Sequence, residues 1–413
     1  GEVPASCWVP VYAVILSAAL MYHLTGLTAG TVLKNRRWAF LVSMGSVFLL
    51  YTVVPQLANL GLVYFEYLTI WPVLTENMHG FMPATVDSAM RAAKTLAPDE
   101  VGFFNLGFPE AVFTIFSQLV LSLTFVVMLW RRWRRTESHL LGKAWATGLC
   151  AWIQVVLLGC SQPLISSGLL FLSRRIGARF RFRGDLTRWN PELGEAILMV
   201  SIYGTVTLLT VVVLSLLIAP GRDGQERGAR RAVKLGRRRS DLLSDESPSL
   251  LFVTVMAVTG AAGWTIFAHL LIGSHWFPGQ VLPAWTPLVF GLVLLTASLC
   301  CVLAYELWGV KGVFLSLVFA GIVPILTGVI MASAASSLST ASVWITGASP
   351  LMAPSNAVAT VLPDGLGEQH ALRLAGPRVF AFWQGLMVIA AMWLFAKHRA
   401  RHVARFQTAG IAA

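Results

Sequence analysis

Charged residues are scarce in this sequence. Asp, Glu, Lys and Arg together make up 12% of its 413 residues, whereas soluble domains carry roughly a quarter. Hydrophobic residues account for 56%, so the chain has too few polar side chains to cover a soluble surface. The composition therefore excludes a soluble catalytic domain and predicts a protein whose surface lies largely in lipid.

Cysteine is also rare. The five cysteines have neither the CxxC spacing of a metal site nor the even spacing of a disulfide framework. Most of them lie in apolar segments, where they act as small packing residues. His398 and His402 are four residues apart, but they belong to a basic tail that is better explained as a solvated face. We expect no metal site and no cofactor.

Catalytic motifs are missing as well. No segment matches the phosphate-binding loop GxxxxGK[ST], and no GxSxG, HExxH or GxGxxG occurs in a strand, turn and helix context. We therefore predict no catalytic residue in this chain, and any ATP hydrolysis must come from a partner.

Long apolar runs are abundant instead. A membrane core about 30 Å thick needs roughly 20 apolar residues per helix, and such runs recur along the whole sequence. We predict an all-α, polytopic transmembrane bundle of about nine membrane helices. The predicted spans are residues 8–30, 38–57, 109–130, 144–172, 195–219, 250–273, 284–304, 312–331 and 379–396.

Three segments allow more than one interpretation. Residues 60–74 are apolar but contain Glu66 and Pro72, so they could extend the second helix, lie at the interface or fold back into the protein. Residues 85–96 place apolar side chains at helical spacing and predict a short interfacial helix. The stretch 159–163 interrupts the fourth span, which is either a broken helix or a helix followed by a re-entrant piece.

The net charge of +12 is concentrated just beyond the apolar runs, where Lys and Arg meet anionic lipid headgroups. We expect membrane lipid as a partner and no nucleic acid. Short cytoplasmic loops are enriched in Lys and Arg, and this rule places one set of basic turns inside: 31–37, 131–143, 220–249, 305–311 and 397–413. Six arginines between 174 and 188 then lie outside, unless the fourth span is a hairpin.

The basic stretch 220–249 also divides the chain. We predict a first transmembrane region over 1–219, a cytosolic linker over 220–249, and a second transmembrane region with a short basic tail over 250–413.

Few ionisable residues fall inside the spans, where they are costly and often functional. Glu110 lies just inside the third span and Glu195 begins the fifth, and both are candidates for a substrate or proton pathway. The alternative for both is interfacial anchoring or helix capping, because the first turn of a helix favours carboxylates. The other polar residues of the spans are Ser, Thr, Gln and Gly, which suit helix packing.

Four stretches resemble exporter-type ABC transporter permeases. The first is YHLTGLTAGTVLKNRRWAF at 22–40, where an apolar helix enters a basic turn and returns to the membrane. The second is LWRRWRR at 129–135. The others are the proline-containing GVFLSLVFAGIVPILTG at 312–328 and GASPLMAPSNAVATVLP at 347–363, which is expected in an outer loop.

This resemblance implies the permease subunit of an ATP-driven exporter in a bacterial inner membrane. Such a subunit pairs as a homodimer or heterodimer and binds a separate ATP-binding subunit. The polar segment with which these permeases begin is missing before Gly1, so we expect an N-terminally incomplete chain. The spans after residue 250 exceed the six-helix core of the family and would be an added part.

Short, stiff turns at helix ends are suited to transmitting motion from a partner. The partner-contact candidates are the charged residues of three such turns: Lys34, Arg36, Arg37, Arg131, Arg132, Arg134, Arg135, Glu306 and Lys311. Two other functions remain open. A membrane-embedded enzyme acting on lipid or glycan would bind phosphate through the arginines of 174–188, beside Glu192 or Glu195. A membrane scaffold would carry out no transport of its own.

Overall fold

The computed structural model describes most of the apolar part of the chain. The described residues are 5–32, 36–60, 62–74, 100–104, 106–134, 140–166, 191–219, 250–271, 285–334, 339–354, 382–394, 396, 397, 401 and 404. The predicted interfacial helix at 85–96, the arginines of 174–188 and the linker at 220–249 lie outside these residues.

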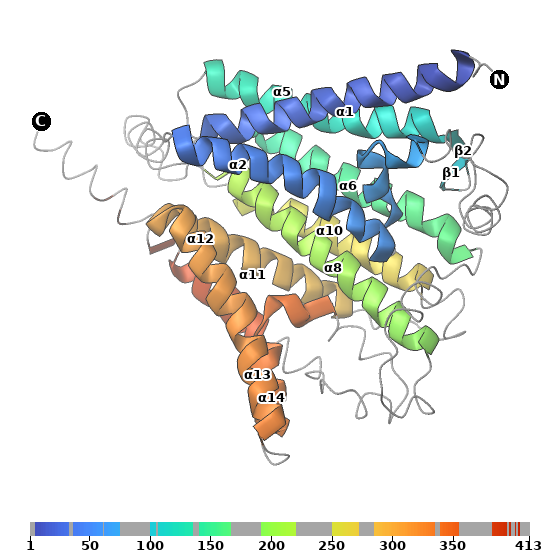
Figure 1. Ribbon diagram of the computed structural model, residues 1–413. Coiled ribbons are helices and arrows are strands. Elements are labelled where there is room, and N and C mark those ends of the chain that lie inside the picture. The colour runs from blue at the N-terminus through green and yellow to red at the C-terminus, as the bar shows by residue number, and fades with distance from the viewer. Residues whose placement is uncertain are drawn as a thin grey trace, which may run out of the picture. The chain divides into compact units, whose positions relative to one another are not determined.

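The described part is helical almost throughout, which confirms the predicted all-α class (Figure 1). Within the described residues, eight helices are long and apolar enough to cross a membrane, and the chain is therefore a multi-pass membrane protein. They are Trp8–Thr31, Arg37–Ala58, Glu110–Trp133, Lys143–Gln162, Met199–Leu217, Leu250–Leu271, Trp285–Trp308 and Lys311–Met331. The ninth predicted span, 379–396, is described as a shorter apolar helix, Phe382–Leu394.

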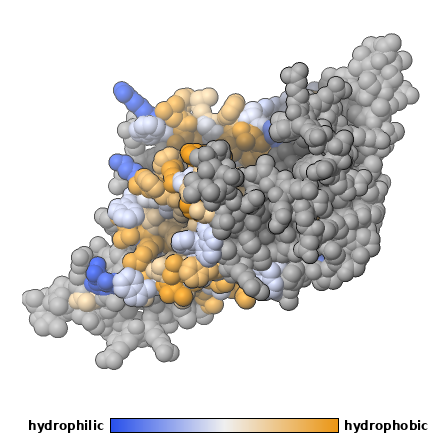
Figure 2. Space-filling view, turned by 90° about the horizontal axis from the view of Figure 1, so that it is seen from below, coloured by the Kyte–Doolittle hydropathy of each residue, from blue (hydrophilic) through white to orange (hydrophobic). Residues whose placement is uncertain are grey.

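Apolar side chains cover much of the surface of these helices. In the span Arg37–Ala58, Trp38, Phe40 and Phe48 are all exposed. Figure 2 shows mostly hydrophobic residues on the described surface, with hydrophilic ones at its edge. Such a surface is stable in hydrocarbon and unstable in water.

The chain forms two compact units. One contains Gly1–Arg134 and Val155–Glu195, and the other contains Arg135–Gln154 and Ala196–Ala413. This division differs from the predicted one, because helix α8 (Pro191–Leu217) belongs largely to the same unit as the helices that follow residue 249. The predicted boundary at 220–249 lies outside the described residues and stays a prediction.

In the first unit, helices α1 (Ala5–Val32) and α5 (Glu110–Arg134) run parallel. Val14 belongs to an apolar cluster that includes Ile115, and one turn later the Ser17 hydroxyl donates to Oε1 of Gln118. Helix α2 (Arg36–Phe48) returns along α1. The end of α1, the start of α2 and the end of α5 therefore lie together, and these are the ends that carry basic turns (Figure 1).

Residues 62–74 fold back into the first unit, so the third interpretation of this segment is correct. After the π-helical η1 (Leu49–Val53) and the 3-10 helix η2 (Val54–Leu60), the second 3-10 helix η3 (Val63–Leu68) turns toward α1 and α5. The Tyr22 hydroxyl donates to the Leu68 carbonyl at 3.3 Å, and Nε2 of Gln118 donates to the Thr69 carbonyl at 3.3 Å. These bonds satisfy backbone that no helix ladder pairs.

Helix α6 (Lys143–Ser166) is continuous, so the break expected at 159–163 is absent from its described length. Pro163 has no N–H and leaves the Gly159 carbonyl without its helical donor. The N–H of Phe104 donates to that carbonyl instead, at 3.1 Å. Phe104 lies in an unpredicted hairpin of β1 (Glu100–Phe103) and β2 (Leu106–Pro109), whose Phe103 ring occupies the space above Gly159.

In the second unit, α8, α10 (Leu250–Leu271) and α11 (Trp285–Trp308) form antiparallel neighbours. Nε1 of Trp264 in α10 donates to the Val200 carbonyl in α8 at 3.1 Å, and the Trp264 ring packs on Phe290 in α11. The Leu141 N–H, just before α6, donates to the Leu217 carbonyl at the end of α8 at 3.2 Å.

These contacts bring several helix ends together in the second unit. They are the start of α6, the end of α8, the start of α10 and the end of α11. The sequence predicts basic turns on the inner side at these same ends, and the shared end is consistent with that scheme. The cytosolic assignment itself stays a prediction.

Candidate ligand site

The centre of the second unit holds a polar group whose members satisfy one another, here called the Gln154 cluster: Gln154, Tyr203 and Thr207. The Tyr203 hydroxyl donates to Oε1 of Gln154 at 3.0 Å, and Nε2 of Gln154 donates to Oγ1 of Thr207 at 3.3 Å. All three residues are buried. Gly263 of α10 gives the cluster room, because a Cβ at that position would overlap the Gln154 amide.

A helix of the same unit is interrupted in the middle of its span. Helix α12 (Val310–Ser316) passes into the π-helical η6 (Leu317–Ile322) and then into α13 (Val323–Ala334). The Val323 N–H bonds to the Val318 carbonyl, five residues back, as in a π-turn. Pro324 follows and supplies no N–H. Interruptions of this kind are frequent at functional sites.

The segment after α14 (Ser339–Gly347) packs against the interrupted helix and bonds to one of its carbonyls. The Ser349 hydroxyl donates to the Gly321 carbonyl at 2.6 Å and accepts from the Leu351 N–H at 3.3 Å. It thereby holds the 3-10 helix η8 (Pro350–Met352) against η6. The sequence places residues 347–363 in an outer loop. For Gly347–Pro354 this is wrong, because Ser349, Pro350 and Ala353 are buried beside η6 and α8.

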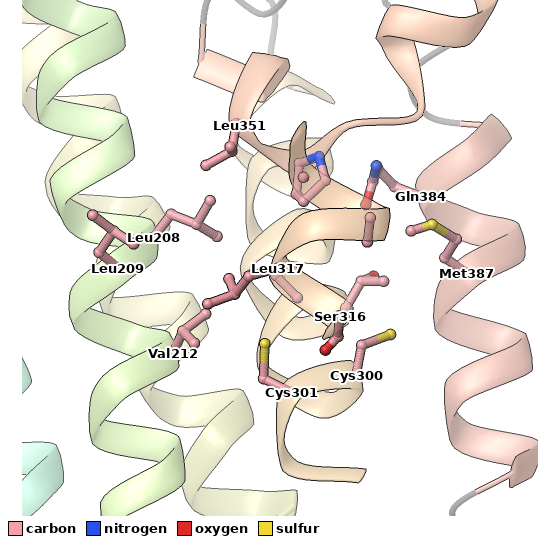
Figure 3. Close-up of a pocket in the computed structure, with 15 residues that line it drawn as sticks. Leu208, Leu209, Val212, Cys300, Cys301, Ser316, Leu317, Leu351, Gln384 and Met387 are labelled. Atoms are coloured by element: carbon pink, nitrogen blue, oxygen red, sulfur yellow. The ribbon is translucent and has the colours of Figure 1, made fainter. Parts of the chain in front are cut away.

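A pocket opens between these elements and is here called the Gln384 pocket (Figure 3). Its walls come from α8, α11, η6, η8 and the helix Phe382–Leu394, represented by Leu208, Thr296, Leu317, Leu351 and Met387. It contains about 540 Å³ of space between atoms, part of it open to the surroundings. Of the lining residues that belong to candidate membrane spans, most fall near the middle of the span.

Gln384 is the polar feature of this pocket. Its side chain is fully buried, and Figure 3 shows the amide reaching from the last helix toward the other walls. The amide nitrogen and oxygen both lack a hydrogen-bond partner among the described residues. The hydroxyls of Thr296 and Ser316 also line the pocket, but each bonds to a carbonyl of its own helix. Among the described lining residues there is no carboxylate, amine, guanidinium or imidazole.

A tight corner connects the pocket to the end of the unit where the basic turns are expected. Gly309 adopts φ 68°, which favours glycine, and turns the chain from α11 into α12. Gly312 lies so close to the Ala304 carbonyl that a Cβ would overlap it. Lys311 is exposed at this corner and Glu306 is nearly buried. The short α12 leads from the corner directly to Leu317 in the pocket wall.

The predicted partner-contact residues divide between the two units. In the first, Arg37 and Arg132 are exposed and Arg131 is half-buried, all at the shared end of α1, α2 and α5. In the second, Glu306 and Lys311 share the α11–α12 corner. The side chains of Arg36 and Arg134 are not described, and Lys34 and Arg135 lie outside the described residues. Their contact role stays a prediction.

Of the two pathway candidates, Glu110 alone has a described side chain, and it is not among the described residues that line the pocket. Glu110 is the first residue of α5, half-buried beside η3. Burial, followed by the negative charge of Glu110, raises the pKa of the nearby Tyr67 far above its usual range. Glu195 lies in α8, where its side chain is not described. The enzyme interpretation depends on Glu192, Glu195 and the arginines of 174–188, which are also not described.

The sequence pattern does not single out Gln384. Glutamines in the spans are expected to serve helix packing, which is what Gln118 and Gln154 do. The separation of Gln384 from its lining neighbours Leu208 and Thr296 along the chain leaves no local motif. The proline in the eighth predicted span was the available signal, because Pro324 marks the interrupted helix.

Comparisons with protein-family models, with curated protein sequences and with solved structures find no match for this chain. The likeness to ABC exporter permeases therefore depends on the sequence stretches alone.

Proposed function

We propose that this chain is the membrane-spanning permease subunit of an ATP-driven exporter in a bacterial inner membrane. The observation that carries the proposal is the Gln384 pocket, which lies at mid-span beside the interrupted helix η6. Transporters commonly place their substrate sites near the bilayer midplane between discontinuous helices. Apolar walls around a single amide suit a hydrophobic or amphipathic substrate.

The α11–α12 corner supports a partner that hydrolyses ATP. Lys311 offers an exposed charge, and the close fit of Gly312 against Ala304 makes the corner stiff. Because α12 is only a short helix, a displacement of the corner would reach Leu317 and Gly321 with little loss. The exposed Arg37 and Arg132 give the first unit a second contact area. Pairing with a second permease chain follows the resemblance.

Purification of the tagged chain from native membranes tests this proposal. We expect a nucleotide-binding subunit to co-purify, and ATP to drive a neutral lipophilic dye across vesicles that contain the complex. Lys311→Glu should reduce both co-purification and ATP-driven transport, whereas Lys311→Arg should preserve both because it keeps the charge. The thermal stability of both variants should match that of the original chain, because Lys311 is exposed. If no ATPase subunit accompanies the chain and ATP stimulates no transport, the proposal is wrong.

A further inference from the structure

We infer that the Gln384 pocket binds an uncharged amphipathic alcohol, whose hydroxyl pairs with the Gln384 amide while its hydrocarbon part fills the apolar walls. The ligand class is thus a neutral lipid-like molecule such as a monoacylglycerol. Only the statement that this molecule is transported rests on the proposed function, because binding to the pocket requires no ATP.

The Gln384 amide has no hydrogen-bond partner among the described residues. A buried polar group without a hydrogen-bond partner destabilises the folded protein. The two other buried glutamines among the described residues, Gln118 and Gln154, have hydrogen bonds to neighbouring segments. Gln384 has none there, although it is fully buried and directed into a pocket. A side chain of this kind is best explained by a ligand that supplies the missing bonds.

The amide also restricts the polar group of the ligand. Its nitrogen offers two donors and its oxygen accepts. A hydroxyl can accept from Nε2 and donate to Oε1, so one alcohol group can serve both atoms. A plain hydrocarbon would leave both atoms unpaired.

The uncharged lining of the pocket also restricts the charge of the ligand. The described residues of the lining include no Lys, Arg, His, Asp or Glu. A carboxylate, phosphate or ammonium group would therefore enter the membrane interior without a counter-charge, which is strongly unfavourable. Anionic phospholipids and cationic drugs are excluded on this ground, and the neutral alcohol remains.

The walls fit the rest of such a molecule. Leu208, Leu317, Leu351 and Met387 present hydrocarbon or thioether groups from four different elements. About 540 Å³ of space lies between the lining atoms, and part of it is open to the surroundings.

A photo-crosslinking experiment on the full chain in detergent or vesicles, without ATP, tests the inference. Three probes carry a diazirine in the same alkyl chain: a monoacylglycerol, the corresponding fatty acid and the corresponding alkane. We expect the monoacylglycerol to label peptides that contain Thr296, Leu317 or Met387 and to bind more tightly than the other two probes. Gln384→Leu should weaken monoacylglycerol binding about tenfold, equivalent to one hydrogen bond of ~1.4 kcal/mol, without weakening alkane binding.

Two further variants serve as controls. Ala320→Leu reduces the free space and should lower labelling by every probe, since Ala320 lines the pocket. Leu386→Ala lies on the same helix as Gln384 but is exposed, and should change nothing. Equal labelling by all three probes, unaffected by Gln384→Leu, would mean occupation by bulk lipid only and would overturn the inference. Labelling of the pocket without ATP-driven transport would leave the inference standing and contradict the proposed function, whereas ATP-driven transport without pocket labelling would do the reverse.

Discussion

Two buried glutamines of the second unit have opposite surroundings. Gln154 bonds to Tyr203 and Thr207 and packs against a glycine of α10 that leaves no spare room. Gln384 has no partner among the described residues and borders a pocket. A glutamine side chain therefore holds helices together at position 154 and borders a pocket at position 384. The difference lies in the neighbours and not in the residue type.

The glycines next to these glutamines repeat the contrast. Gly204 follows Tyr203 in α8, and a Cβ there would overlap the Pro354 ring and lie 3.0 Å from Nε1 of Trp264. Gly385 follows Gln384, and a Cβ there would meet no atom of the described residues within 4 Å. The helices that form the Gln154 cluster are thus closely packed at Gly204 and Gly263, whereas the helix beside the pocket has an open position at Gly385.

The largest expected effect is the difference between Gly204→Ala and Gly385→Ala. Overpacking at Gly204 should lower the free energy of unfolding by about 1–3 kcal/mol. The same change at Gly385 should be neutral or raise the free energy of unfolding by up to ~1 kcal/mol, because alanine favours the helix. Unfolding of the purified protein by SDS in mixed micelles measures both values. A tolerated alanine at position 204 would show that the cluster is not closely packed.

The next largest effect is that leucine at the two glutamine positions should change the free energy of unfolding differently. Gln154→Leu leaves the buried Tyr203 hydroxyl without its acceptor and should destabilise the ligand-free protein by about 1–2 kcal/mol. Gln384→Leu removes an amide that has no partner there, and should leave stability unchanged or raise it by up to ~1 kcal/mol. The same micelle assay is used, with lipid removed as far as the protein allows. Equal destabilisation by both variants would refute the contrast between the two sites.

Much of the fold can be predicted from the sequence, because exposing a long apolar run to water is unfavourable whatever the rest of the chain does. Each membrane span can therefore be predicted from its own residues. Eight predicted spans and the basic turns between them require no knowledge of tertiary contacts. The interpretation of residues 159–163 as a break in the helix is wrong, because it leaves out a tertiary contact. The carbonyl freed by Pro163 accepts a bond from Phe104, which is distant in sequence.

The candidate site depends even more on distant contacts. Pro324 indicates an interrupted helix. The Ser349 hydroxyl that donates to the Gly321 carbonyl, however, comes from a segment expected in an outer loop. Gln384 becomes distinctive only once its lack of a partner is known. Polar residues of the same type look alike in a sequence, and their hydrogen bonds distinguish them.

The smallest expected effect separates Ser349 from Ser342, which make similar bonds in different places. The Ser349 hydroxyl donates to the Gly321 carbonyl at the pocket, and the Ser342 hydroxyl donates to the Gly328 carbonyl between α14 and α13, away from it. Alanine at either position removes one bond to the neighbouring helix and should lower the free energy of unfolding by about 0.6 kcal/mol. At position 349 it also removes the local bond from the Leu351 N–H.

Ligand binding should distinguish these two alanine variants. Ser349→Ala loosens η8, which carries the wall residue Leu351, so monoacylglycerol affinity should fall about threefold, the equivalent of that same bond. Ser342→Ala should leave the affinity unchanged, since Ser342 does not line the pocket. A matching loss of affinity in both variants would mean that ligand binding follows general stability, and the Ser349 bond would then have no specific role in shaping the pocket.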